Sequence, residues 1–125
     1  MKRKIMAVTL TAAMLAGLAA VPVWADDAGS DEGKVLNIYC WNEEFKSRLT
    51  DHYPGYEEVD GTHGKIGDVD VVWNITPSDD NAYQNNLDET LLKQADAAAD
   101  DKIDLFLVEA DYALKYVNTD YTMSV

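Results

Sequence analysis

Three apolar segments along the chain have the hydrophobic pattern of β-strands. Residues 35–41 are apolar on nearly both faces, as in a strand inside a sheet. Residues 68–75 place valine, tryptophan and isoleucine side chains on one face and Asp70 and Asn74 on the other, so this strand is expected at a sheet edge. Residues 103–110 contain four consecutive apolar side chains, which predicts a third strand buried on both faces.

The segment after the first strand has helical spacing. Asn42 is expected to cap this helix. Apolar residues recur in it at every fourth position, at Phe45, Leu49 and Tyr53. A Pro-Gly pair ends the helix, and residues 56–67, which contain three glycines, are expected to form a loop.

Two further helices are predicted downstream. The second is expected to be long and amphipathic, with Ser78 as its cap and an end near residue 100. Its apolar stripe, which Leu92 broadens, consists of Tyr83, Leu87, Leu91, Ala95 and Ala98. The third helix is expected over residues 111–117, with Ala113, Leu114 and Val117 on its apolar side.

The alternation of strands and helices predicts an α/β fold with right-handed parallel crossovers. Because the segment 68–75 has a half-polar face, we expect a parallel sheet of three strands in the order 2-1-3 with this segment at one edge. The third strand would then keep an uncovered apolar edge. We therefore interpret residues 34–125 as the beginning of a larger domain.

The first 25 residues have the features of a cleaved signal peptide. Basic residues at positions 2–4 precede an apolar run, and Pro22 and a small-residue site ending at Ala25 follow it. Residues 26–33 lack large apolar side chains and are expected to be an acidic spacer. The protein is therefore predicted to be exported to the periplasm or the extracellular cell surface.

Removal of this segment makes the charge more negative. All 23 acidic residues and seven of the ten basic residues lie after Ala25, which gives the mature chain a net charge of −16. Such a surface repels phosphate backbones and anionic lipids, which argues against nucleic-acid or membrane-surface binding. The single cysteine, Cys40, lies in the first strand. It is expected to be buried and inert, and it is too far from the signal peptide to carry a lipid anchor.

Two polar and aromatic clusters follow the first and third strands. They are residues 41–44, Trp-Asn-Glu-Glu, and residues 109–112, Glu-Ala-Asp-Tyr. Ligands of open parallel sheets bind outside the carboxyl ends of the strands, so both clusters are expected to face one crevice. Carboxylates accept hydrogen bonds from hydroxyl groups, and aromatic rings cover the apolar faces of sugars. The alternative, that Glu43 and Glu44 only stabilise the start of a helix, stays open.

The chain resembles the extracellular solute-binding proteins of carbohydrate ABC transporters, among them the maltodextrin-binding proteins. The resemblance covers Lys34 to Val125 and is most specific in LNIYCWNEEF and DKIDLFLVEADYAL. It implies a periplasmic-binding-protein-like fold of two lobes that close on a solute and deliver it to membrane permease subunits. Residues 34–125 would be part of the N-terminal lobe.

The resemblance also implies roles for particular residues. Asn42, Glu43 and Glu44 would lie in the first ligand-contact loop, and Glu109, Asp111 and Tyr112 in the loop after the third strand. Trp41 is expected to contact the ligand, with packing in the core as the alternative. A second group of candidates is Asn81, Tyr83 and Gln84, although Tyr83 fits the apolar stripe better.

Two other classes of protein remain open. Paired carboxylates among the candidates could serve a glycosidase, and a secreted adhesin or scaffold needs no ligand. The chain contains no nucleophile elbow, no phosphate-binding glycine loop and no Cys/His metal spacing. We therefore expect a binding protein without enzymatic activity, cofactor or metal. His52 and His63 are expected to be exposed.

Overall fold

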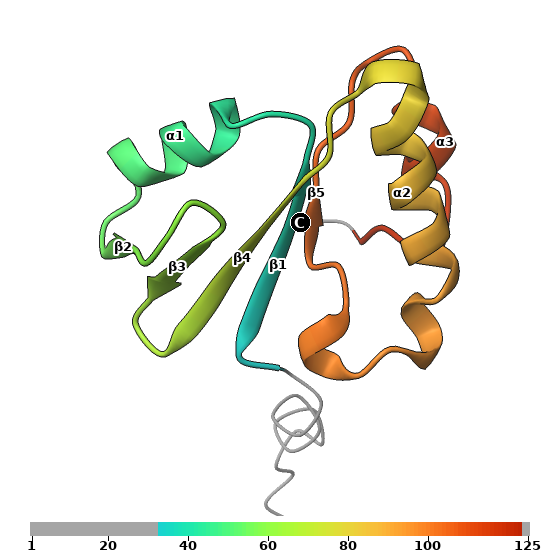
Figure 1. Cartoon of the computed structure of the whole chain (residues 1–125). Coiled ribbons are helices and arrows are strands. Elements are labelled where there is room, and N and C mark those ends of the chain that lie inside the picture. The colour runs from blue at the N-terminus through green and yellow to red at the C-terminus, as the bar shows by residue number, and fades with distance from the viewer. Residues whose placement is uncertain (1–32, 124–125) are drawn as a thin grey trace, which may run out of the picture.

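The computed structural model describes residues 33–123, and these form an α/β fold around one mixed five-stranded sheet (Figure 1). The strands are β1 (Val35–Cys40), β2 (Tyr56–Glu58), β3 (His63–Ile66), β4 (Val69–Ile75) and β5 (Leu105–Phe106). The α-helices are α1 (Glu44–His52), α2 (Ala82–Leu92) and α3 (Leu114–Val117). Three 3₁₀ turns accompany them: η1 (Asp79–Asn81), η2 (Gln94–Asp96) and η3 (Ala99–Asp101). The expected signal peptide, and all of the expected spacer except Gly33, lie outside the described residues.

The sheet has the strand order β2-β3-β4-β1-β5. β1 pairs in parallel with both β4 and β5, whereas β3 pairs antiparallel with β2 and β4. The expected all-parallel sheet of three strands with residues 68–75 at its edge is therefore wrong. The three predicted strands do lie side by side in parallel, but β4 is an inner strand of a larger mixed sheet.

A β-hairpin replaces the loop that was expected over residues 56–67. Gly67, with φ of +59°, and Asp68 form the two-residue connection between β3 and β4, a position that favours glycine in a tight hairpin. Gly64 lies directly beneath the ring of Tyr56, where a Cβ atom would clash with the phenol. The phenol oxygen of Tyr56 accepts a hydrogen bond from Trp73 Nε1 at 3.0 Å. The glycines thus make close strand pairing possible.

Helices cover both faces of the sheet, with α1 on one side and α2 and α3 on the other (Figure 1). Under α1, Phe45 and Leu49 pack against a buried cluster formed by Ile38, Cys40, Val71 and Trp73. The predicted burial of Cys40 is confirmed. On the opposite face, Tyr39 and Phe106 pack against a second buried cluster formed by Tyr83, Leu87, Leu91, Ile103 and Tyr116.

The second helix is shorter than its apolar stripe predicts. It ends at Leu92, whose side chain is 75% exposed, and residues 94–101 form two 3₁₀ turns instead of continuing the helix. The amide of Gln94 donates from Nε2 to the carbonyl of Ile103 at 2.8 Å and accepts the Ile103 N–H at 2.9 Å. This pair of hydrogen bonds ties the chain to the entry of β5, which explains why the helix stops.

The third strand and the third helix are also shorter than expected. β5 has two residues and lies at the sheet edge, where Leu105 remains 39% exposed. In α3, Leu114 and Val117 are 77% and 53% exposed, whereas Tyr116 is buried. The predicted apolar side of this helix is therefore wrong, because the ring of Tyr116 packs against Phe106 at a centroid distance of 5.4 Å and so orients the helix.

Candidate functional site

A polar pocket of about 210 Å³ lies between the start of α2 and the loop after β5. It is lined by Ser78, Asn81, Tyr83, Gln84, Glu109, Asp111 and Tyr112. The structure therefore groups the predicted cluster 109–112 with the second group of candidates on α2. Ser78 was expected only as a helix cap, and it makes no capping hydrogen bond.

The other predicted cluster does not line this pocket. Asn42 Oδ1 accepts the backbone N–H of Glu44 at 3.0 Å, but the N-cap residue of α1 is Glu43, which makes no side-chain capping hydrogen bond, so the expected cap at Asn42 is wrong. The carboxylate of Glu44 pairs with Arg48 at 2.6 Å on the solvent surface. Glu43 lines a separate pocket of about 440 Å³ beside Lys46. These contacts match the alternative in which the two glutamates serve the start of a helix.

Tyr83 lines the pocket and is otherwise part of the core. Its side chain is 1% exposed, which confirms the expectation that it belongs to the core. Its hydroxyl donates to the carbonyl of Leu107 at 2.6 Å and lies 3.1 Å from the carbonyl of Tyr39. Burial is the main cause that raises the pKa of Tyr83 far above its usual range, so the phenol is a neutral donor. Tyr83 therefore joins α2 to the ends of β1 and β5.

Trp41 lies next to Tyr83 and is partly buried. The two rings meet edge to face with centroids 5.4 Å apart, a favourable aromatic geometry. Trp41 packs against the core cluster beneath α2 and does not line the polar pocket. Through this contact Trp41 packs against Tyr83, one of the residues that line the pocket.

The start of α2 depends on two residues with left-handed backbone conformations. Asp80 has φ of +51° and Asn81 has φ of +61°. The helix then begins at Ala82, and the N–H of Asn81 donates to the carbonyl of Ser78 at 3.1 Å. Left-handed conformations are costly for residues other than glycine, and asparagine and aspartate tolerate them best. This turn brings Ser78 and Asn81 to the rim of the pocket.

Alanine at position 81 is expected to lower the free energy of unfolding by about 1 kcal/mol, because alanine lacks the tolerance of asparagine for positive φ. Glycine at the same position should be tolerated. Chemical denaturation of both variants measures the effect. Asn85→Ala, at an exposed position inside α2, serves as the control and should not be destabilised. Equal stability of Asn81→Ala and Asn81→Gly would contradict the left-handed turn.

The pocket offers hydrogen-bonding groups that are not used within the described residues. The side chains of Ser78, Asn81, Gln84, Glu109, Asp111 and Tyr112 make no hydrogen bond to residues 33–123. No lysine, arginine or histidine lines the pocket. Partial burial, together with the nearby carboxylates of Glu109 and Asp111, raises the pKa of Tyr112. The pocket can therefore accept several donors from a ligand and can present an aromatic ring to it.

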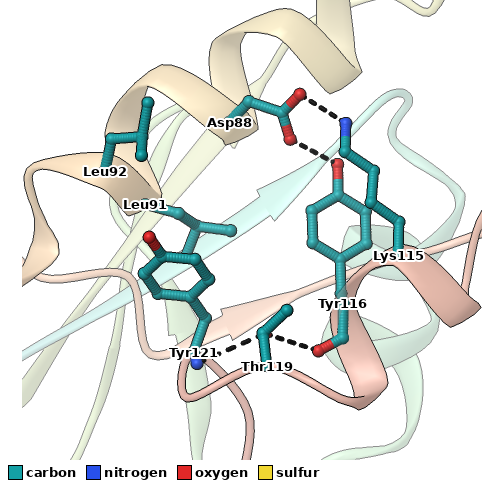
Figure 2. Close-up of a pocket in the computed structure, with 7 residues that line it drawn as sticks. All are labelled: Asp88, Leu91, Leu92, Lys115, Tyr116, Thr119 and Tyr121. Carbon is teal, nitrogen blue, oxygen red and sulfur yellow. Dashed lines mark hydrogen bonds and ion pairs between the residues drawn. The ribbon is translucent and has the colours of Figure 1, made fainter.

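A third pocket, of about 270 Å³, lies between α2 and α3 (Figure 2). Its charged groups are already paired with each other. Lys115 Nζ donates to one carboxylate oxygen of Asp88, and the hydroxyl of Tyr116 donates to the other at 2.8 Å. The remaining wall is largely apolar and includes Leu91 and Tyr121. No sequence pattern signals this cluster, because Lys115 and Tyr116 lie 27 and 28 residues after Asp88. We interpret the cluster as a structural connection between the two helices.

Comparison with known proteins gives no relative for this chain. Neither a scan against protein-family models nor searches of curated proteins and of solved structures found a match. Within residues 33–123, no cluster of three or more histidine, cysteine or acidic side chains could hold a metal ion. None of the helices in that region combines the length and the apolar character that crossing a membrane requires.

Proposed function

We propose that this protein is an exported solute-binding protein that captures a small polar solute, which we expect to be a carbohydrate, and delivers it to the permease of an ABC transporter. The observation that carries the proposal is the polar pocket, where six side chains have unused hydrogen-bonding groups. The pocket follows β5, a parallel strand beside β1, and ligands of α/β proteins bind at such strand ends.

The lining of the pocket suits a hydroxylated ring. Glu109 and Asp111 provide carboxylate oxygens that accept hydroxyl protons, and Asn81 and Gln84 provide amides that both donate and accept. Tyr112 provides an aromatic ring for the apolar C–H face of a sugar. Together these groups meet both needs of sugar recognition, hydrogen bonding at the rim and an apolar surface against the ring.

The proposal includes a second lobe that completes the binding site. The pocket has a volume of about 210 Å³, below the roughly 300–1,000 Å³ that is usual for sites enclosing a whole ligand. In addition, the outer edge of β5 has no neighbouring strand among the described residues. Residues 34–125 would thus be one part of the N-terminal lobe, and a facing lobe would supply the remaining contacts.

Sugar binding is tested by titrating the protein with a panel of mono- and oligosaccharides, using calorimetry and amide chemical shifts. For a sugar that binds, the double variant Glu109→Gln and Asp111→Asn should weaken binding by about 10- to 100-fold. Each substitution replaces a hydrogen bond to a charged acceptor, which contributes about 1.5–3 kcal/mol, with a neutral one, which contributes about 0.5–1.5 kcal/mol. Tyr112→Ala should weaken it by about tenfold.

The matched control is Glu57→Gln. Glu57 is exposed on β2 and lines none of the pockets described above, so this variant should bind the sugar as the wild type does. Unchanged affinity in the pocket variants would contradict the proposal. Release of reducing ends from an oligosaccharide would identify a glycosidase instead, and no rise in melting temperature with any sugar would favour a scaffold.

A further inference from the structure

The polar pocket contains two carboxylates and no compensating positive charge. Glu109 and Asp111 are the only acidic or basic residues among those that line it. Five ion pairs join side chains within residues 33–123, and neither of these carboxylates takes part in one. The whole chain also carries 23 acidic and ten basic residues. The pocket therefore has a negative potential that its own residues do not cancel.

We infer that the pocket discriminates solutes by charge, binding a hydroxylated solute with an ammonium group, such as an amino sugar, more tightly than a neutral sugar and rejecting an anionic one. This inference rests on the proposed function, since it concerns the same pocket, and it makes the class of solute more specific.

An ammonium group would gain two kinds of contact here. An ammonium group donates to Glu109 or Asp111 from a positive charge, so it adds a Coulomb attraction that the hydrogen bond from a sugar hydroxyl to the same carboxylate lacks. The ring of Tyr112 lines the pocket beside these carboxylates, and the face of an aromatic ring attracts cations. A neutral sugar makes only the weaker form of each contact.

An anion would face repulsion without any compensating partner. The raised pKa of Tyr112 reports the same field, because the negative charges of Glu109 and Asp111 add to the effect of burial in opposing a phenolate. The carboxylate or phosphate of a solute in that pocket would meet the same two charges. Among the residues that line it, no lysine, arginine or histidine could offset them.

The pocket between α2 and α3 shows the contrasting arrangement. There the carboxylate of Asp88 is neutralised by Lys115 and also accepts the Tyr116 hydroxyl (Figure 2). An uncancelled pair of carboxylates thus distinguishes the polar pocket from the pocket between the two helices. We place the charge selectivity at Glu109 and Asp111 because the same pocket also has unused hydrogen-bonding groups and the ring of Tyr112.

Three sugars of nearly the same shape test the inference: glucosamine, glucose and glucuronate. Each is titrated into ¹⁵N-labelled protein at about pH 6, where the amine of glucosamine is charged. Glucosamine should bind about three- to tenfold more tightly than glucose, and glucuronate more weakly than both. Added salt should reduce the difference in affinity between glucosamine and glucose, because it screens the charges. Glu109→Gln should reduce that difference to about twofold or less, whereas Glu57→Gln should leave it unchanged.

The outcomes separate the inference from the proposed function. If glucose binds at residues 109–112 as tightly as glucosamine, or glucuronate binds most tightly, the charge selectivity is overturned while sugar capture stands. If the preference for glucosamine survives in Glu109→Gln and also in Asp111→Asn, the selectivity does not come from these carboxylates. If none of the three sugars shifts the amide signals of residues 109–112, the inference and the proposed function fail together.

Discussion

Replacing Tyr83 with alanine is expected to lower the free energy of unfolding by about 3–5 kcal/mol, the usual cost of truncating a fully buried aromatic side chain. The ring of Tyr83 is 1% exposed and packs edge to face against Trp41. Its hydroxyl also donates to the carbonyl of Leu107 at 2.6 Å. The substitution would remove both the packing and this connection between α2 and the end of β5.

Tyr83→Phe separates these two contributions. It keeps the ring and leaves the carbonyl of Leu107 without the hydroxyl donor, which should cost about 1–3 kcal/mol. Leu107 lies two residues before Glu109, so this variant should also loosen the pocket and weaken solute binding. Urea denaturation measures both variants, with Tyr53→Ala as the control, since Tyr53 is 50% exposed and its loss should matter much less. Wild-type stability of Tyr83→Phe would contradict the hydrogen bond to Leu107.

Replacing Asn37 with leucine is expected to lower the free energy of unfolding by about 2–4 kcal/mol. Asn37 is a buried polar residue in β1, only 9% exposed. Its side-chain amide donates to the carbonyls of Asp100 and Lys102 at 2.8 and 2.9 Å. Leucine has a similar size and offers no donor, so two partly buried carbonyl groups would lose their partners.

Asn85→Leu provides the matched control for Asn37→Leu. Asn85 is exposed in α2, and surface substitutions of this kind usually change stability by less than about 0.5 kcal/mol. Thermal and urea unfolding measure both variants. In Asn37→Leu, hydrogen exchange should also speed up at residues 100–104, because the contacts that hold this segment to β1 are gone. Equal stability of the two variants would contradict the role of Asn37.

Tyr83 and Asn37 together fix the position of the two-residue strand β5. Tyr83 holds the chain at its exit through Leu107, and Asn37 holds the η3 turn before its entry. Asn37 also donates its backbone N–H to Asp104 Oδ2 at 2.8 Å. The loop 109–112, which carries Glu109 and Asp111, follows directly from this anchored strand. Stability and the geometry of the pocket therefore depend on the same hydrogen bonds.

The candidate site was only partly predictable. The cluster at residues 109–112 was expected because it follows an apolar strand-like run, and Asn81 and Gln84 were secondary expectations from the start of the second helix. Their grouping with Ser78 in one pocket follows from the left-handed turn at Asp80 and Asn81, which no hydrophobic pattern signals. The pairing of Asp88 with Lys115 and Tyr116 also lacked a local signal, because helix packing brings these residues together.

Local periodicity alone determined the α/β class, the three parallel strands near residues 35–41, 68–75 and 103–110, and the burial of Cys40 and Tyr83. Each of these follows from the local sequence, through the alternation of elements, the spacing of apolar residues or the usual burial of cysteine. Only the tertiary structure decided the hairpin β2–β3, the early end of α2 and the direction of α3. In each case a contact with another part of the chain decided the outcome. The pairing of β2 with β3 formed the hairpin, the hydrogen bonds between Gln94 and Ile103 ended α2, and the packing of Tyr116 on Phe106 oriented α3. Such contacts outweigh helix propensities, which differ by only a few tenths of a kcal/mol per residue. They join residues far apart in the sequence, so the spacing of apolar residues along the chain does not reveal them.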